Sequence, residues 1–317
     1  MSFAFEDTDL AELAGRLDEP DAAVRRIAVM QLAETAEVDA ISLLIKALGD
    51  ADADVRMEAA RALDEFEGPE IVEALMDSLS DADEAVREAA AESLSEIKEV
   101  SLAPLILARL PGPDAFSRAA LLRALRELRS DGALDPAMDA LSDGDARVRR
   151  EAVGVLGYLK ADAALFGLMN AARTDEDAEV RRAAVGALVF STSDKIAETL
   201  IQGLADENWR VREEAAASLG KNGVPGAVSA LMDAMGDEYW QVRTKAAGSL
   251  GKLKDPRAVP VLGEALSFQV SNLRKEAAAA LGEIADPAAL PFLEVALKDS
   301  DPDVRKLARW AIDRIAA

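Results

Sequence analysis

Ten arginines recur along the chain at one spacing. Each belongs to a nine-residue phrase, Val-Arg-x-x-Ala-x-x-x-Leu, with small variations, that returns every 31 residues except for one step of 32. The ten are Arg25, Arg56, Arg87, Arg118, Arg149, Arg181, Arg212, Arg243, Arg274 and Arg305. A guanidinium group binds a carboxylate through two parallel hydrogen bonds. Because every copy carries the arginine, we predict a packing role, with each arginine paired to an aspartate of its own or the adjacent loop.

Aspartates gather just before many of these phrases. Asp50, Asp52 and Asp54 stand at alternate positions, as in the opening of a calcium loop. Such a loop also needs glycine at its sixth place and a bidentate glutamate at its twelfth, and Val55 and Arg61 stand there instead. An aspartate before a helix accepts hydrogen bonds from unpaired backbone N–H groups. The clusters are therefore predicted to cap helices, and no metal site is expected.

The composition excludes several chemistries. The 317 residues include no Cys and no His, so Cys nucleophiles, Ser-His-Asp triads, disulfides and Cys/His metal sites lack their parts. No apolar run approaches the roughly 18 residues of a membrane helix, and the first residues carry no basic region followed by an apolar stretch. We therefore expect a soluble, cytoplasmic protein without a cofactor.

The charge of the chain bears on its partners and its origin. Its 59 acidic and 36 basic residues give a net charge of −23, which opposes binding to nucleic acid or anionic membranes. Only 11 of the basic residues are lysines. An acidic, lysine-poor, Cys-free surface is typical of a salt-rich cytoplasm, where self-repulsion is screened. We therefore expect a halophilic protein.

Two helices per repeat must position these residues. A short apolar segment comes first, such as 71–79 or 196–204, and the phrase follows on a second helix. The Val, Ala and Leu of the phrase lie at i, i+4 and i+8, which forms one stripe for burial. Half of the residues are apolar but only 4% are aromatic, which suits closely stacked helices.

The phrase, its Asp-rich lead-in and the 31-residue period resemble the HEAT-like repeats of the phycobilisome-lyase (PBS lyase) type, over about residues 7–317. The resemblance implies an all-α fold, a right-handed α-solenoid of about ten two-helix repeats in a single domain, 1–317. The expected repeats are 7–37, 38–68, 69–99, 100–130, 131–161, 162–193, 194–224, 225–255, 256–286 and 287–317. Three repeats depart from the pattern: the fourth has Pro111 to Pro113 in its loop, the sixth has one extra residue, and the ninth has Ser267 to Asn272.

One face of each second helix points away from the buried stripe. Counted from the arginine, it holds positions −3, −2, +1, +2, +5 and +9, and the resemblance implies that this face lines a concave surface. In the first four repeats it carries nine acidic residues and three basic ones, a balance of −6. The nine are Glu34, Asp54, Glu58, Glu65, Glu84, Glu88, Glu92, Glu96 and Glu127. In repeats five to eight, seven basic residues face four acidic ones, a balance of +3.

Aromatic residues accompany this change of sign, in repeats whose +5 positions hold only Gly or Ala. Trp, Tyr and Arg are common hot spots of protein interfaces. We therefore predict a partner-binding groove; packing of the aromatics between repeats is the alternative. The predicted groove residues are Trp209, Trp240, Tyr158, Phe190, Tyr239, Arg147, Arg150, Arg182, Arg210, Lys221, Lys245 and Lys252.

These features favour a non-enzymatic scaffold that binds an acidic or mixed apolar and acidic segment of another protein. The alternative is an accessory lyase or chaperone for a protein that carries a tetrapyrrole or another cofactor. The resemblance also covers two kinds of enzyme. The deoxyhypusine-hydroxylase type binds iron through His-Glu pairs, and this chain has no His; the DNA glycosylases need a strongly basic groove. No catalytic residue is predicted, and neither a membrane nor nucleic acid is an expected partner.

Overall fold

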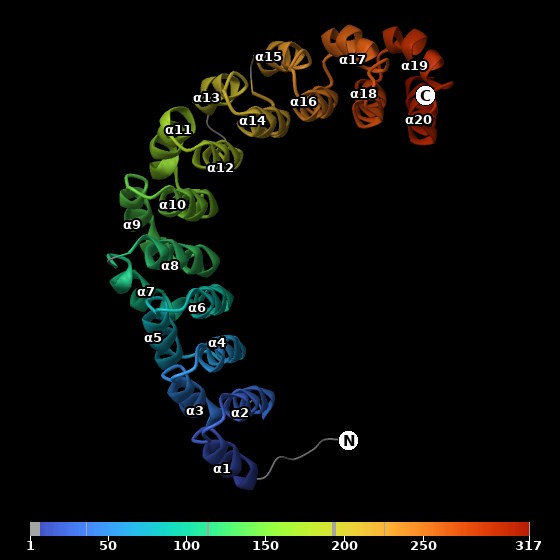
Figure 1. The fold of residues 1–317 in the computed structure, drawn as a ribbon. Helices are drawn as coiled ribbons and strands as arrows, with labels where there is room; N and C mark the ends of the chain where they lie inside the picture. Colours follow the sequence, from blue (N-terminus) through green and yellow to red (C-terminus); the bar gives the residue numbers. More distant parts are fainter. Residues whose placement is uncertain (1–6, 36, 113, 192–194, 225, 317) are drawn as a thin grey trace. The chain divides into compact units, whose positions relative to one another are not determined.

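The computed structural model describes residues 7–35, 37–112, 114–191, 195–224 and 226–316. In these ranges the chain folds into twenty α-helices, which alternate between a first and a second helix of each repeat (Figure 1). This confirms the prediction of an all-α solenoid of about ten two-helix repeats. None of the helices within these ranges is long and apolar enough to cross a membrane.

The first helices are short. They are α1 (Asp7–Arg16), α3 (Ala40–Ala47), α5 (Pro69–Ser78), α7 (Ala103–Arg109), α9 (Leu134–Ala140), α11 (Leu165–Thr174), α13 (Ile196–Gly203), α15 (Ala227–Ala234), α17 (Val259–Ala265) and α19 (Leu290–Ala296). Short 3₁₀ segments lie at 63–65, 100–102, 131–133, 162–164, 256–258 and 287–289. The sixth repeat has its extra residue in α11, which is ten residues long where α9 has seven.

The second helices carry the phrase. They are α2 (Ala22–Thr35), α4 (Ala53–Ala62), α6 (Glu84–Glu96), α8 (Ala115–Leu128), α10 (Ala146–Leu159), α12 (Ala178–Leu188), α14 (Trp209–Asn222), α16 (Trp240–Leu253), α18 (Ser271–Ile284) and α20 (Pro302–Ala316). In α4 and the residue after it, Val55, Ala59 and Leu63 are fully buried, as the stripe predicted. Small alanines in the middle of the stripe let neighbouring helices pack closely.

Aspartates begin several second helices. The side chain of Asp52 accepts hydrogen bonds from the backbone N–H groups of Asp54 (3.0 Å) and Val55 (3.3 Å). Asp83 accepts one from Ala85 (2.9 Å) in the same way. These bonds satisfy N–H groups that have no partner within the helix. The predicted capping role of the Asp-rich loops is confirmed at these helices.

The chain divides into two compact units, residues 1–159 (unit 1) and 160–317 (unit 2). Unit 1 contains α1 to α10 and unit 2 contains α11 to α20. Within each unit the first helices form one layer and the second helices another (Figure 1). The exposed side of the second layer is called the second-helix face below, and the opposite side the first-helix face. A single domain over residues 1–317 stays a prediction.

Candidate functional site

A ladder of bidentate ion pairs joins successive repeats. Arg25 donates from Nε and Nη2 to the two carboxylate oxygens of Asp50, at 2.7 and 2.8 Å. Its Nη1 donates to the backbone carbonyl of Glu19 (2.9 Å). The aspartate comes 25 residues after the arginine and so belongs to the next repeat. The same spacing joins Arg56 to Asp81, Arg118 to Asp143, Arg181 to Asp206, Arg212 to Asp237 and Arg274 to Asp299.

This ladder is a packing device, as the sequence indicated. The hydrogen bonds from Arg25 hold the pKa of the Asp50 carboxyl below its ordinary value, and Arg56 does the same for Asp81. A lowered carboxyl pKa means that the folded chain favours the charged form. Each of these guanidinium groups therefore has its partners inside the protein, so it is not available for a ligand.

The ladder lacks an aspartate in the fourth and ninth repeats, two of the irregular ones; in the sixth, the extra residue puts Thr174 at the 25-residue position and Asp175 next to it. Gly112 and Phe268 stand 25 residues after Arg87 and Arg243. The guanidinium of Arg87 lies over the ring of Phe116, 5.7 Å from its centroid. Arg243 lies 4.8 Å from the ring centroid of Phe268. A cation–π contact thus replaces the ion pair at both junctions.

Three of the predicted lysines meet around one hollow on the second-helix face of unit 2. Lys221 comes from α14, whereas Lys245 and Lys252 come from α16. The hollow measures about 450 Å³, and its other lining residues are Glu213, Glu214, Ala217, Thr244, Gly248, Ser249 and Glu276. All three lysines are exposed, and they form no ion pair with any described residue. The structure therefore presents three ammonium groups in a concave site of side-chain size.

Ala217 and Gly248, the small residues at the +5 positions of α14 and α16, line this hollow and leave space for it. A Cβ atom added at Gly248 would clash with the carboxylate of Glu276, which extends from α18 over that glycine. The glutamate belongs to the ninth repeat, where it occupies the +2 position. The hollow thus holds three lysines and three glutamates, so its formal charge is balanced. The sequence reasoning missed Glu276 because it counted only repeats five to eight.

Trp209 and Tyr239 pack against each other at one edge of the face. Their rings are stacked, with centroids 5.4 Å apart and planes 11° apart. Arg210 covers Trp209 at 5.6 Å, and Arg212 covers Tyr239 at 5.5 Å. These two aromatics therefore pack between repeats seven and eight, which is the alternative that the sequence left open.

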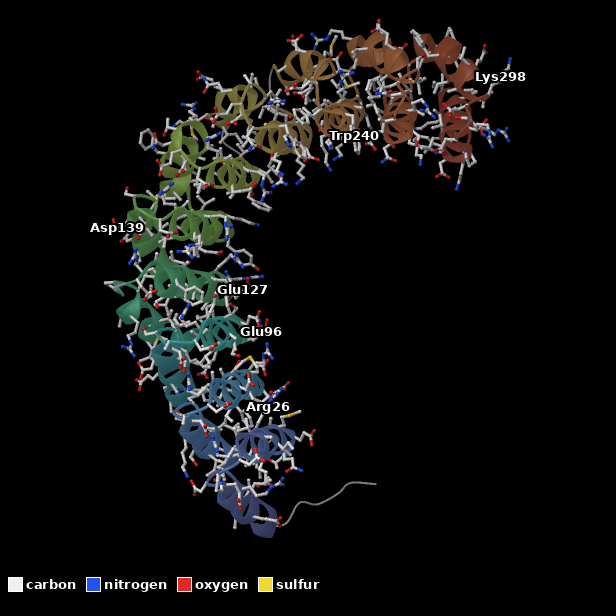
Figure 2. The ribbon with its side chains drawn as sticks, in the orientation of Figure 1. Arg26, Glu96, Glu127, Asp139, Trp240 and Lys298 are labelled. Atoms are coloured by element: carbon white, nitrogen blue, oxygen red, sulfur yellow. The ribbon has the colours of Figure 1, made fainter. Side chains whose placement is uncertain are left out.

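Trp240 has a different setting. It begins α16 (Figure 2) and is half-buried. Its backbone carbonyl accepts a hydrogen bond from Oγ1 of Thr244 (2.8 Å), a residue that lines the hollow. Positions i and i+4 of a helix lie on the same side. Trp240 thus lies one turn before Thr244 on the same side of α16, next to the residues that line the hollow and not among them.

Tyr158 and Phe190 lie at the C-terminal ends of the second helices of their repeats, α10 and α12. They are 39% and 56% exposed, and each contacts a cation from the preceding repeat. Arg129 lies 4.7 Å from the ring centroid of Tyr158 and donates to its hydroxyl (2.7 Å), and Lys160 lies 4.8 Å from that of Phe190. In unit 2, Trp240 stands at position −3 of its repeat and Phe190 at position +9. These two positions are separated by about 18 Å along the axis of a helix. Phe190 therefore does not share a patch with Trp240.

The predicted arginines are engaged by nearby carboxylates. In unit 2, Arg182 and Arg210 both pair with Glu179, at 2.8 and 3.4 Å. In unit 1, Arg147 pairs with Asp145 at 2.8 Å, and Arg150 lies 3.6 Å from a carboxylate oxygen of Glu151. Glu151 is only 6% exposed and also receives Arg126. Of the predicted basic residues, the three lysines are thus the ones that remain free of carboxylate partners in the described chain.

The second-helix face of unit 1 is acidic. Glu84, Glu88 and Glu92 are exposed along α6, and Figure 2 marks Glu96 and Glu127 on the same side of the unit. Arg26 offsets one charge there through its pair with Glu58 (3.0 Å). The second-helix face of unit 1 thus carries the acidic side chains that the sequence assigned to it.

Stacked two-helix repeats, joined from one repeat to the next by arginine–aspartate pairs, define an α-solenoid. Models of HEAT repeats match residues 10–95, 58–116, 102–189, 165–250, 197–269 and 234–313. The chain therefore belongs to the HEAT-repeat family. The match is to HEAT repeats in general and does not single out the PBS lyase type. No match was found among curated protein sequences.

Solved structures share this fold at low identity. An engineered protein is 23% identical over 98% of this chain and 99% of its own, with a TM-score of 0.54. Kap95p, in a structure with RanGDP, is 16% identical over 96% of this chain and 50% of its own, with a TM-score of 0.66. The karyopherin Kap121p, bound to the extreme C-terminus of the phosphatase Cdc14p, is 16% identical over 99% of this chain and 42% of its own, with a TM-score of 0.56. The chain thus spans half or less of these two karyopherin chains.

Proposed function

We propose that the protein is a non-enzymatic scaffold that holds a segment of another protein on the second-helix face of unit 2. The observation that carries the proposal is the hollow of about 450 Å³ around Lys221, Lys245 and Lys252. Its lysines are not engaged by carboxylates of the described chain, so they can form ion pairs with a partner. Kap121p, which shares the fold, is bound to the extreme C-terminus of the phosphatase Cdc14p in its structure, and this supports the binding of a protein segment here.

The chemistry of the hollow defines the segment. Lysine ammonium groups bind carboxylates, and the half-buried Trp240, one helical turn before Thr244 of the lining, offers apolar surface beside them. Glu213, Glu214 and Glu276 would repel a segment made only of acidic residues. The segment that fits has one or two acidic side chains next to apolar or neutral ones.

The finer assignments belong to the same proposal. The phrase and its Asp-rich lead-in support the PBS lyase type of repeat, without implying lyase activity. A cytoplasmic place of action is consistent with the composition. The scaffold role needs no cofactor, because the chemistry of the face is that of ion pairs and apolar contact.

Capture from a lysate of the source organism tests the proposal. The full chain serves as bait beside the double variant Lys245→Glu/Lys252→Glu. The control, Lys298→Glu/Lys306→Glu, changes the net charge equally at two exposed lysines outside the hollow. We expect one partner captured by the wild type and by the control but lost with the first variant. Equal capture by all three proteins would contradict the proposal.

A further inference from the structure

Unit 1 contains a second hollow, on its first-helix face. It measures about 410 Å³ and lies among α7, α8, α9 and the start of α10. Its lining residues are Leu107, Leu110, Pro111, Arg118, Leu122, Pro136, Asp139, Ala140, Ser142, Asp143 and Val148. Figure 2 shows Asp139 on the side of unit 1 away from Glu127. This hollow is therefore separate from the second-helix face.

The sequence explains why a hollow forms at this repeat. One buried position of the first helix is Leu or Ile in nine of the ten repeats: Leu13, Leu44, Leu75, Ile106, Leu168, Leu200, Leu231, Leu262 and Leu293. The fifth repeat has Ala137 there, next to Pro136 of the wall. The Asp-rich turn of the fourth repeat is also replaced, by Pro111 and Gly112. The change to Ala137 removes side-chain volume from α9, and Pro111 of the altered turn forms part of the wall.

The ion pair in the wall, between Arg118 and Asp143, is already formed within the protein. Arg118 donates from Nε and Nη2 to the carboxylate of Asp143, at 2.8 and 3.0 Å. Its Nη1 donates to the backbone carbonyl of Gly112 (3.1 Å). Most other lining side chains are apolar: Leu, Pro, Ala and Val. A polar occupant would lose its water contacts without replacement, so the hollow fits an apolar group.

An acidic stripe reaches the hollow at Asp139, which is one of its lining residues. Asp131, Asp135 and Asp139 follow each other at intervals of four residues, on the 3₁₀ turn at 131–133 and on α9. All three are exposed, and within the described residues none forms an ion pair. Residues four apart share one side of a helix. The stripe therefore complements a positively charged group that reaches it from the occupant.

We propose that this hollow binds a segment of a partner protein that inserts one bulky apolar side chain and places a lysine or arginine against the acidic stripe. An apolar anchor in a pocket with complementary charge at its rim is the usual composition of an interface hot spot. The charge preference is opposite to that of the lysine hollow in unit 2. The protein thus has two binding surfaces that select different segments.

Selection from a random peptide display library tests this proposal on the full chain. The wild type is the target, and Ala140→Phe, which fills the hollow, is used for counter-selection. Asp135→Lys/Asp139→Lys reverses the stripe at exposed positions and does not threaten the fold. The matched control is Asp233→Lys/Ala234→Phe, since these residues have the same register on α15 as Asp139 and Ala140 on α9.

The enriched peptides are expected to contain Phe, Leu, Ile, Met or Trp with Lys or Arg within about one helical turn. Their binding, measured by fluorescence anisotropy, should weaken at least about tenfold with either unit 1 variant and stay unchanged with the α15 control. Acidic or uncharged peptides, equal binding to the stripe variant, or no enrichment would each overturn the proposal.

Discussion

Removing one carboxylate from the ladder should destabilise the fold far more than removing an exposed one. The pair between Arg181 and Asp206 is suited to this test because its side chains are only 8% and 11% exposed. Arg181 donates to Asp206 at 2.8 and 2.9 Å and to the backbone carbonyl of Asp175 at 2.9 Å. Asp206 also accepts the backbone N–H of Asn208 (2.8 Å). The change Asp206→Ala therefore removes three hydrogen bonds and leaves a buried guanidinium with only the exposed Glu207, at 3.1 Å, as its counter-charge.

The expected cost follows from that geometry. Breaking a buried ion pair by removing one partner costs about 3–5 kcal/mol, because the remaining charge stays desolvated. The bond from Arg181 to the Asp175 carbonyl and its pair with the exposed Glu207 both survive, so we expect the lower end, about 3 kcal/mol. The comparison is the pair of Lys46 with Asp18, whose side chains are 56% and 69% exposed. Asp18→Ala should cost less than about 1 kcal/mol, since exposed pairs contribute little.

Urea unfolding followed by circular dichroism at 222 nm measures both variants against the wild type. Repeat proteins can lose cooperativity, so the slope of each transition is compared as well as its midpoint. We expect a clear fall of the midpoint for Asp206→Ala and almost none for Asp18→Ala. Equal midpoints for the two variants would refute the view that the ladder couples the repeats.

Three further predictions follow. The pKa values of the Asp50 and Asp81 carboxyl groups are lowered by their arginines, so the stabilisation is complete above the ordinary Asp pKa and is lost as pH falls through the lower folded values. The urea midpoint of unfolding should therefore drop steeply below about pH 4. A midpoint that does not change with acid would contradict this. Phe268→Asp restores a carboxylate opposite Arg243 and should raise the unfolding midpoint, by an amount on the order of 1 kcal/mol; a lower midpoint would show that the cation–π contact is the better partner. A net charge of −23 should make stability rise with KCl concentration, because salt screens self-repulsion; thermal melts that do not respond to KCl would remove the expectation of a halophilic origin.

Much of the fold could be predicted because the same short pattern is repeated ten times. A stripe at i, i+4 and i+8 must be buried, and an aspartate before a helix caps it, as Asp52 does. The pairing of the arginines with an aspartate of their own or the adjacent loop was also predictable; the structure shows that the partner lies in the next repeat, 25 residues on, as in Arg25 and Asp50. These features depend on neighbours within one or two repeats, where helix geometry alone fixes which residues meet.

The site was harder to predict because it depends on contacts between repeats. Helix periodicity placed Trp209 and Tyr239 at the face, but it could not show that they stack on each other. It could not show that Glu276 enters the hollow from the next repeat, over Gly248. The apolar hollow of unit 1 does have a signal in the sequence, since Ala137 interrupts a row of leucines and isoleucines. Comparison of the first helices, as well as the second, would have found it.

Photo-crosslinking tests the central claim most directly. A photoreactive phenylalanine analogue replaces Thr244, which lines the lysine hollow, or Glu264, which is exposed on α17 in the first-helix layer of the same unit. Both full-length proteins are irradiated in lysate of the source organism, and the adducts are identified by mass spectrometry. The account predicts one partner joined through a segment with acidic and apolar residues at position 244 and absent at position 264. Adducts at position 264 alone, or the same adducts at both positions, would contradict it.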